Sequence, residues 1–104
     1  MKKYEVVVVP EVEGQIREQL IFIARHSVDN ALAWEQRLRD AIDSIGIFPG
    51  HSVDIERTKR MGTEVRKMVF EKTYIVHYLV TESRKIVEII NFCHGARLPS
   101  HDKR

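Results

Sequence analysis

The sequence has 104 residues, of which 43% are hydrophobic and 31% are charged. This length fits one domain, and this composition excludes an intrinsically disordered chain. The longest apolar run, Val6–Val9, is far too short for a membrane span of roughly 18 residues or for the core of a signal peptide. The single cysteine, Cys93, excludes an internal disulfide and a multi-cysteine zinc site. We therefore expect one globular domain, residues 1–104, in a reducing cytoplasm.

Charge is distributed unevenly along the chain, although the formal net charge is only +2. Residues 1–54 contain 6 basic and 9 acidic side chains, whereas residues 55–104 contain 11 basic and 6 acidic side chains. The second half, with its net charge of +5, is a candidate surface for phosphate groups or for an acidic protein. Ordinary solvated lysines and arginines are the alternative, and the modest density of charge favours it.

The chain begins with a predicted strand and a predicted helix. Residues 4–9 are β-branched and apolar without alternation, which is typical of a strand buried on both faces. Pro10 ends this strand and suits the first turn of a helix, where its missing N–H costs nothing. Apolar residues then recur every three or four positions, which predicts a helix over residues 11–26.

A second helix is predicted after a short connection. Ser27 and Asp29 are suitable N-cap residues, and Pro49 ends the segment. The predicted apolar face consists of Ala31, Trp34, Leu38, Ala41 or Ile42, and Ile45. Because the connection is short, we expect the two helices to form an antiparallel hairpin. Trp34 is expected to pack between this hairpin and a sheet.

The remaining elements are predicted to be a long loop and three strands. Residues 51–62 show no clear period, which predicts a long loop that carries basic residues at 57–60. Loops of this length are uncommon in small domains unless they bind something or are mobile. Residues 64–70, 74–80 and 86–93 are rich in β-branched and aromatic residues, which predicts an antiparallel meander. We expect the first strand to join this meander. The order of elements predicts an α+β fold in which the hairpin covers one face of a mainly antiparallel sheet.

The pattern over nearly the whole chain, from about Tyr4 to Arg97, resembles a known family. Its features are the first strand, the hairpin motif Ala31-x-x-Trp34-x-x-x-Leu38-x-x-Ala41-Ile42, the strand with Val65-Arg66, the pair Tyr74-x-x-x-Tyr78, and the closing His94-Gly95-Ala96-Arg97. Together these features resemble the ParE branch of the ParE/RelE toxin superfamily. The closing His-Gly-x-Arg is the most specific of them.

The resemblance implies a RelE/ParE-like β-α-α-β-β-β fold and a bacterial, cytoplasmic toxin of a type II toxin–antitoxin, or plasmid stabilisation, module. Such a toxin is neutralised by a cognate antitoxin encoded beside it. A homodimer or a hetero-oligomer with that antitoxin is compatible with the sequence, which does not fix the oligomeric state. ParE members act on DNA gyrase, whereas RelE members cleave mRNA on the ribosome. RelE-type cleavage is phosphoryl transfer without a metal ion, and we expect neither a metal nor a cofactor.

The match to the RNA-cleaving members is partial. Arg66 and Arg97 fall where those members place basic residues, on a strand and after the last strand. Ile75 replaces the arginine that follows the hairpin tyrosine, and no aromatic residue follows Phe92. Because an isoleucine cannot hold a phosphate, this departure favours the ParE branch, a gyrase inhibitor that is not itself a catalyst. If the chain is an endoribonuclease, the catalytic candidates are Arg66, His94 and Arg97, with His94 as acid or base.

Each candidate also has a structural interpretation. Arg66 would be a solvated strand residue or an ion-pair partner. Arg97 would bind a carbonyl or carboxylate beside a turn in which Gly95 takes a positive φ. His77, in the middle of a strand, is expected to be packed. The sequence leaves open whether the basic residues at 57–60 contact gyrase, DNA or nothing. A small interaction module of the same fold that has lost toxicity is the third possibility for the whole chain.

Overall fold

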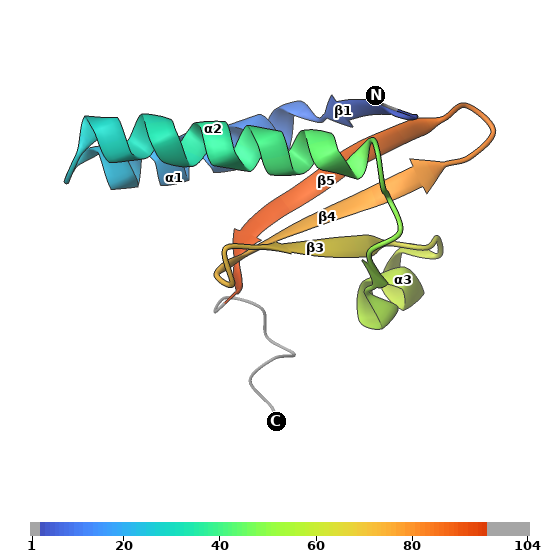
Figure 1. Cartoon of the computed structure of the whole chain (residues 1–104). Coiled ribbons are helices and arrows are strands. Elements are labelled where there is room, and N and C mark those ends of the chain that lie inside the picture. Colours follow the sequence, from blue (N-terminus) through green and yellow to red (C-terminus); the bar gives the residue numbers. More distant parts are fainter. Residues whose placement is uncertain (1–2, 96–104) are drawn as a thin grey trace.

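Three helices and a five-stranded sheet form the part of the chain that the computed structural model describes, residues 3–95. The elements are β1 (Glu5–Val8), α1 (Pro10–Ala24), α2 (Val28–Ile45), β2 (Ser52–Val53), α3 (Ile55–Met61), β3 (Arg66–Phe70), β4 (Tyr74–Thr81) and β5 (Ile86–His94). The strand order is β1-β5-β4-β3-β2, with β1 parallel to β5 and the other neighbours antiparallel. The α1–α2 hairpin covers one face of this sheet (Figure 1), so the predicted α+β arrangement is confirmed.

β1 joins the sheet as expected, but it lies at an edge. It pairs with residues 86–89 of β5, and its four residues alternate between exposed and half-buried. Val6 and Val8 pack against the core, whereas Val7 is 39% exposed. The prediction of burial on both faces is therefore wrong, because the hairpin covers β1 on one face alone. Pro10 then begins α1, where its fixed φ and missing N–H are tolerated.

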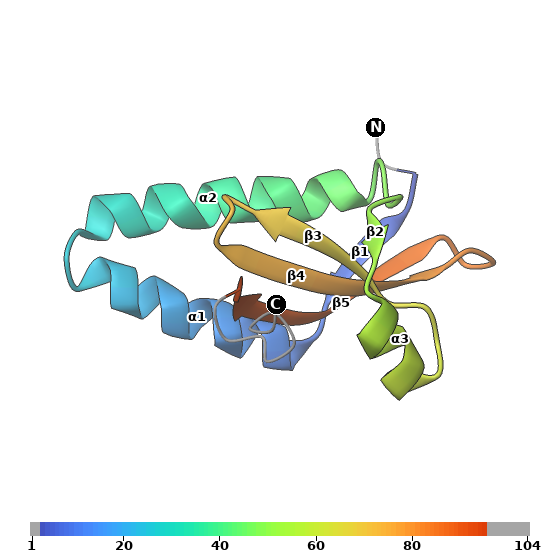
Figure 2. The same cartoon turned by 90° about the horizontal axis from the view of Figure 1, so that it is seen from below.

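The hairpin forms where the sequence predicts it. Ser27 caps α2, because its Oγ accepts a hydrogen bond of 3.1 Å from the backbone N–H of Asn30. Arg39 of α2 reaches across to Glu13 of α1, with its Nη2 2.7 Å from the Oε1 of that carboxylate. The hydrogen bond from Arg39 lowers the pKa of Glu13 below its usual value. The view from below shows the two helices side by side (Figure 2).

The core lies between the hairpin and the covered face of the sheet. From α2 it receives Ala31, Trp34, Leu38, Ile42 and Ile45. The indole of Trp34 stands edge-on to the rings of Phe70, Tyr74 and Phe92, at centroid distances of 6.4, 5.5 and 6.1 Å. Such edge-to-face contacts add to the burial of apolar area. The predicted packing of Trp34 between hairpin and sheet is confirmed.

β5 carries a bulge that interrupts its alternation. Its pairing with β4 shifts by one residue next to Asn91, so Ile90 has no counterpart on β4. Ile89 and Phe92, three positions apart, consequently both face the core. Asn91 lies on the opposite face, across from His77.

Residues 51–62 do not form the long loop that their lack of period predicts. β2 pairs with β3 there, and α3 follows directly. Asp54 caps α3 by accepting a hydrogen bond of 3.0 Å from the N–H of Arg57, and Gly62 ends it with a φ of +74°. No residue of α3 is buried, so the helix has no apolar period to detect.

The turn geometry also differs from the prediction at one glycine. Gly62, and not Gly95, is the glycine with positive φ among the described residues. In the β3–β4 turn, Glu71 and Lys72 take φ values of +52° and +60°. Gly95 instead allows a close approach, since its N–H lies 2.6 Å from the carbonyl oxygen of Thr73 and a Cβ would lie 3.1 Å from that atom.

Two leucines of α2 test the position of the core. Leu38 is fully buried, and Leu32 is 57% exposed. Leu38→Ala should lower the free energy of unfolding by about 2–5 kcal/mol, because it removes buried methyl groups and leaves a cavity. Leu32→Ala should change it by less than about 0.5 kcal/mol. Urea unfolding followed by Trp34 fluorescence measures both values, and equal losses would contradict this core.

Candidate functional site

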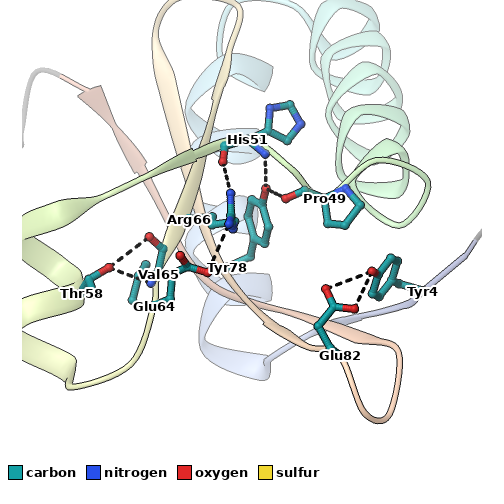
Figure 3. A network of polar contacts seen from close by, with 9 residues as sticks. All are labelled: Tyr4, Pro49, His51, Thr58, Glu64, Val65, Arg66, Tyr78 and Glu82. Atoms are coloured by element: carbon teal, nitrogen blue, oxygen red, sulfur yellow. Dashed lines mark hydrogen bonds and ion pairs between the residues drawn. The ribbon is translucent and has the colours of Figure 1, made fainter.

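Arg66 is bonded to the main chain of the segment that follows α2. Its Nη1 donates to the carbonyl oxygen of His51 at 2.6 Å, and its Nη2 lies 3.2 Å from Oε1 of Glu64 (Figure 3). Beside it, the hydroxyl of Tyr78 donates to the carbonyl oxygen of Pro49 at 2.6 Å and accepts from the N–H of His51 at 3.3 Å. These bonds hold the segment after α2 against β3 and β4. In this structure Arg66 is thus an ion-pair partner with a structural role.

Arg66 pairs with the middle of β4, whereas His94 pairs with its first residue. In the strand register, Arg66 faces Tyr78 and His94 faces Tyr74. These positions are four residues apart on β4, which corresponds to about 13 Å along an extended strand. The third candidate, Arg97, lies outside the described residues. The two described candidates are therefore not brought together.

Ile75, which the resemblance matches to an arginine of the RNA-cleaving members, is 6% exposed. Its neighbours Tyr74 and Val76 belong to the core under the hairpin, so Ile75 points to the other face of the sheet. A charged side chain at this buried position would need a partner to offset its desolvation. The chain places an apolar group there instead.

A chain of hydrogen bonds, which we call the polar relay, crosses the sheet from α3 to α1. His77 Nε2 lies 3.1 Å from Oδ2 of Asp54, and His77 Nδ1 lies 3.1 Å from Nδ2 of Asn91. Asn91 Oδ1 accepts from Gln15 Nε2 at 3.2 Å, and Gln15 Oε1 accepts from the N–H of Phe92 at 3.0 Å. His77 is 0% exposed, which confirms that it is packed. The relay itself was not predicted from the sequence.

The roles of donor and acceptor follow from the two ends of the polar relay. The backbone N–H of Phe92 only donates, and the ionised carboxylate of Asp54 only accepts. The amide nitrogen of Asn91 therefore donates to Nδ1 of His77, and the neutral ring carries its proton on Nε2 and donates it to Asp54. Every donor points toward the carboxylate, so each bond polarises the next.

The environment holds His77 neutral and Asp54 ionised. Burial lowers the pKa of His77 to about 4; the charges of Arg57 and Lys67 act in the same direction, and the hydrogen bond to Asp54 opposes them. Burial by itself raises the pKa of Asp54, but the hydrogen bonds from the backbone of Arg57 and from His77 outweigh it and lower that pKa. The contact is therefore a hydrogen bond between a neutral imidazole and a carboxylate.

An Asp–His pair orients the base in hydrolytic triads, but here both ring nitrogens of His77 are bonded and the ring is shielded from solvent. The sulfur of Cys93 accepts from Asn91 at 3.6 Å. Within residues 3–95, no three His, Cys, Asp or Glu side chains are grouped to hold a metal ion. The geometry of the relay is that of a structural anchor for α3 and α1.

A groove lies between α1 and the C-terminal end of β5. Its volume is about 700 Å³, and Phe22, Arg25, Tyr74, Phe92 and His94 are among the residues that line it. This volume is within the usual range of sites for small ligands. His94 thus belongs to this groove, at the end of the sheet away from Arg66.

No known family model matches the sequence, and no curated protein matches it either. The resemblance to the ParE branch therefore rests on the residue pattern. Among the described residues, no helix is both long enough and apolar enough to cross a membrane.

Gln15 links α1 to β5, and its removal should be costly. Gln15→Ala removes the acceptor of the Phe92 N–H and the donor to Oδ1 of Asn91, so we expect a loss of about 1–3 kcal/mol in unfolding free energy. Hydrogen exchange at the Phe92 amide should become faster. Gln19→Ala is the control, because Gln19 lines the same groove without a place in the relay. Unchanged exchange at Phe92 in Gln15→Ala would contradict the relay.

The relay also predicts a dependence of stability on pH. The pKa of His77 is lowered from 6.5 to about 4 by folding, so the unfolded chain binds the extra proton between these values. The unfolding free energy should be highest above pH 6.5 and should fall by up to about 3 kcal/mol toward pH 4. Urea titrations at several pH values measure this slope. His77→Gln should flatten it, whereas His26→Gln, at an exposed histidine, should not; equal slopes in both variants would refute the assignment.

Proposed function

We propose that this protein is the toxin of a type II toxin–antitoxin module and that it acts, like ParE, on DNA gyrase. The whole-chain residue pattern supports this, together with a helical hairpin that covers one face of a mainly antiparallel sheet. The strand–helix–helix start agrees with the RelE/ParE-like order, and β2 and α3 are additions to it. In this proposal the protein inhibits an essential enzyme by binding it.

Ile75 is the residue that favours gyrase over RNA as the proposed target. Cleavage of RNA without a metal requires a base, an acid and cations around the scissile phosphate. The buried side chain of Ile75 cannot serve as such a cation. Arg66 already binds the His51 carbonyl and Glu64. Its pairing position on β4 is about 13 Å along the strand from the pairing position of His94. These positions favour a binding role over a catalytic one.

The alternative is a RelE-like, ribosome-dependent mRNA endoribonuclease that uses Arg66, His94 and Arg97. Of these three residues, Arg97 lies outside the described part of the chain. An interaction module of the same fold without toxicity is the third candidate.

The proposed partner in either toxin is a cognate antitoxin with an acidic tail. The net charge of +5 in residues 55–104 would attract such a tail. Disordered tails of this kind become ordered as they bind. Capture of the product of the neighbouring reading frame at moderate salt would support this partner, and no capture would count against it.

The deciding experiment expresses the chain from a tightly controlled promoter and follows DNA synthesis and protein synthesis separately in the first minutes. We expect DNA synthesis to fall first, with filamentous cells and DNA damage, because a poisoned gyrase blocks replication. Purified gyrase and supercoiled plasmid should then yield trapped, cleaved DNA when the protein is added. The same gene with an early stop codon is the control.

An earlier fall of protein synthesis, with mRNA cut on ribosomes, would overturn the gyrase proposal and make Arg66, His94 and Arg97 catalytic candidates. Unchanged synthesis of both DNA and protein would overturn both toxin functions and leave the interaction module.

A further inference from the structure

α3 is an unusual element because it buries no side chain of its own. Polar bonds hold it in place instead. Asp54 caps it and is bonded to the buried ring of His77, at the end of the polar relay. Near its middle, the hydroxyl of Thr58 accepts from the N–H of Val65 at 2.9 Å (Figure 3). The structure therefore fixes a short helix firmly without using it for the core.

Four cations gather on and beside this helix. Arg57, Lys59 and Arg60 belong to α3, and Lys67 belongs to β3. We call these four residues the α3 basic surface. Within residues 3–95, the ion pair on this surface joins Arg60 Nη1 to Glu56 Oε1 at 4.0 Å, with both side chains more than 60% exposed. An exposed pair at that distance contributes little, so Arg60 is available to a ligand, and Lys59 is exposed as well.

The register places Lys67 on the same face of the sheet as α3. Lys67 lies directly across from His77 in the β3–β4 pairing, and residues opposite each other in a sheet share a face. His77 in turn is bonded to Asp54, the cap of α3. The charges of Arg57 and Lys67 both lower the pKa of His77, as expected of cations close to one imidazole. Arg57 and Lys67 thus lie close together on the side of the sheet away from the hairpin, and Lys59 and Arg60 belong to the same short helix as Arg57.

We propose that the α3 basic surface binds the phosphodiester backbone of a nucleic acid. Arginine binds phosphates through paired hydrogen bonds, and lysine binds them as a point charge. Because α3 is held in a fixed position, less conformational entropy is lost when its side chains bind a ligand. The exposed apolar residues of α3, Ile55 and Met61, stand at its two ends, so the five residues between them offer no central apolar anchor for a protein. The proposal goes beyond the proposed function, because it assigns nucleic-acid contact to this chain without gyrase or ribosome.

The test measures binding of the full chain to a fluorescent DNA duplex, and separately to an RNA strand, over a series of salt concentrations. Each phosphate contact contributes about −0.9 to the slope of log affinity against log salt on DNA. The double variant Lys59→Ala, Arg60→Ala should bind about tenfold or more weakly at low salt, with a slope reduced by about 2. Both residues are exposed, so the variant should fold normally.

The matched control is the double variant Arg17→Ala, Arg84→Ala, which removes the same charge from exposed positions on α1 and in the β4–β5 turn. It should keep the wild-type slope. DNA and RNA both offer a phosphodiester backbone. Binding of either one supports the proposal if Lys59→Ala, Arg60→Ala weakens it and lowers the salt slope while the control does not.

If both double variants bound nucleic acid equally weakly, the proposal would be overturned, because net charge alone would then explain the binding. Absence of binding to both nucleic acids at low salt would overturn it as well. Polyglutamate serves as the competing probe, and binding of polyglutamate alone would assign the surface to an acidic protein. Because no gyrase is present, a negative result here leaves the proposed function standing.

Discussion

The buried imidazole of His77 imposes the constraint on which the rest of the structure depends. A ring without solvent contact must have both nitrogens bonded, because an unsatisfied buried polar atom costs about 1–3 kcal/mol. One partner, Asp54, precedes α3, and the other, Asn91, belongs to β5 and is bonded to Gln15 of α1. A single side chain in the central strand thereby fixes a helix on each side of the sheet.

This arrangement uses polar side chains for structural hydrogen bonds, although their chemical groups could otherwise serve in catalysis. His77 is neutral and fully bonded, and Arg66 is bonded to the His51 carbonyl and to Glu64. Exposed cations lie elsewhere, and they include Lys59 and Arg60 of the α3 basic surface. A protein whose internal polar groups are structural and whose cations are displayed on a fixed helix is suited to binding a large partner.

Local signals explain which parts of the fold were predictable. Ser27 has a capping side chain, and Trp34 and Leu38 follow the helical period. These signals are local, so α2 can be predicted from residues that are close together in the sequence. α3 was missed although Asp54 and Gly62 are good cap signals, because its surroundings leave it without an apolar face. Of the site, the packing of His77 was predicted but its partners were not.

The sequence by itself determined the helical hairpin and the antiparallel meander, because apolar periods and turn residues act over a few positions. It also indicated that β1 joins a sheet, because the run Val6–Val9 is apolar. The tertiary structure alone decided that β1 is an edge strand, that Gln15 meets Asn91 across the chain, and that Arg66 and His94 lie apart. These features depend on strand register, including the bulge at Ile90. Register is set by the packing of distant segments, which no short stretch of sequence encodes.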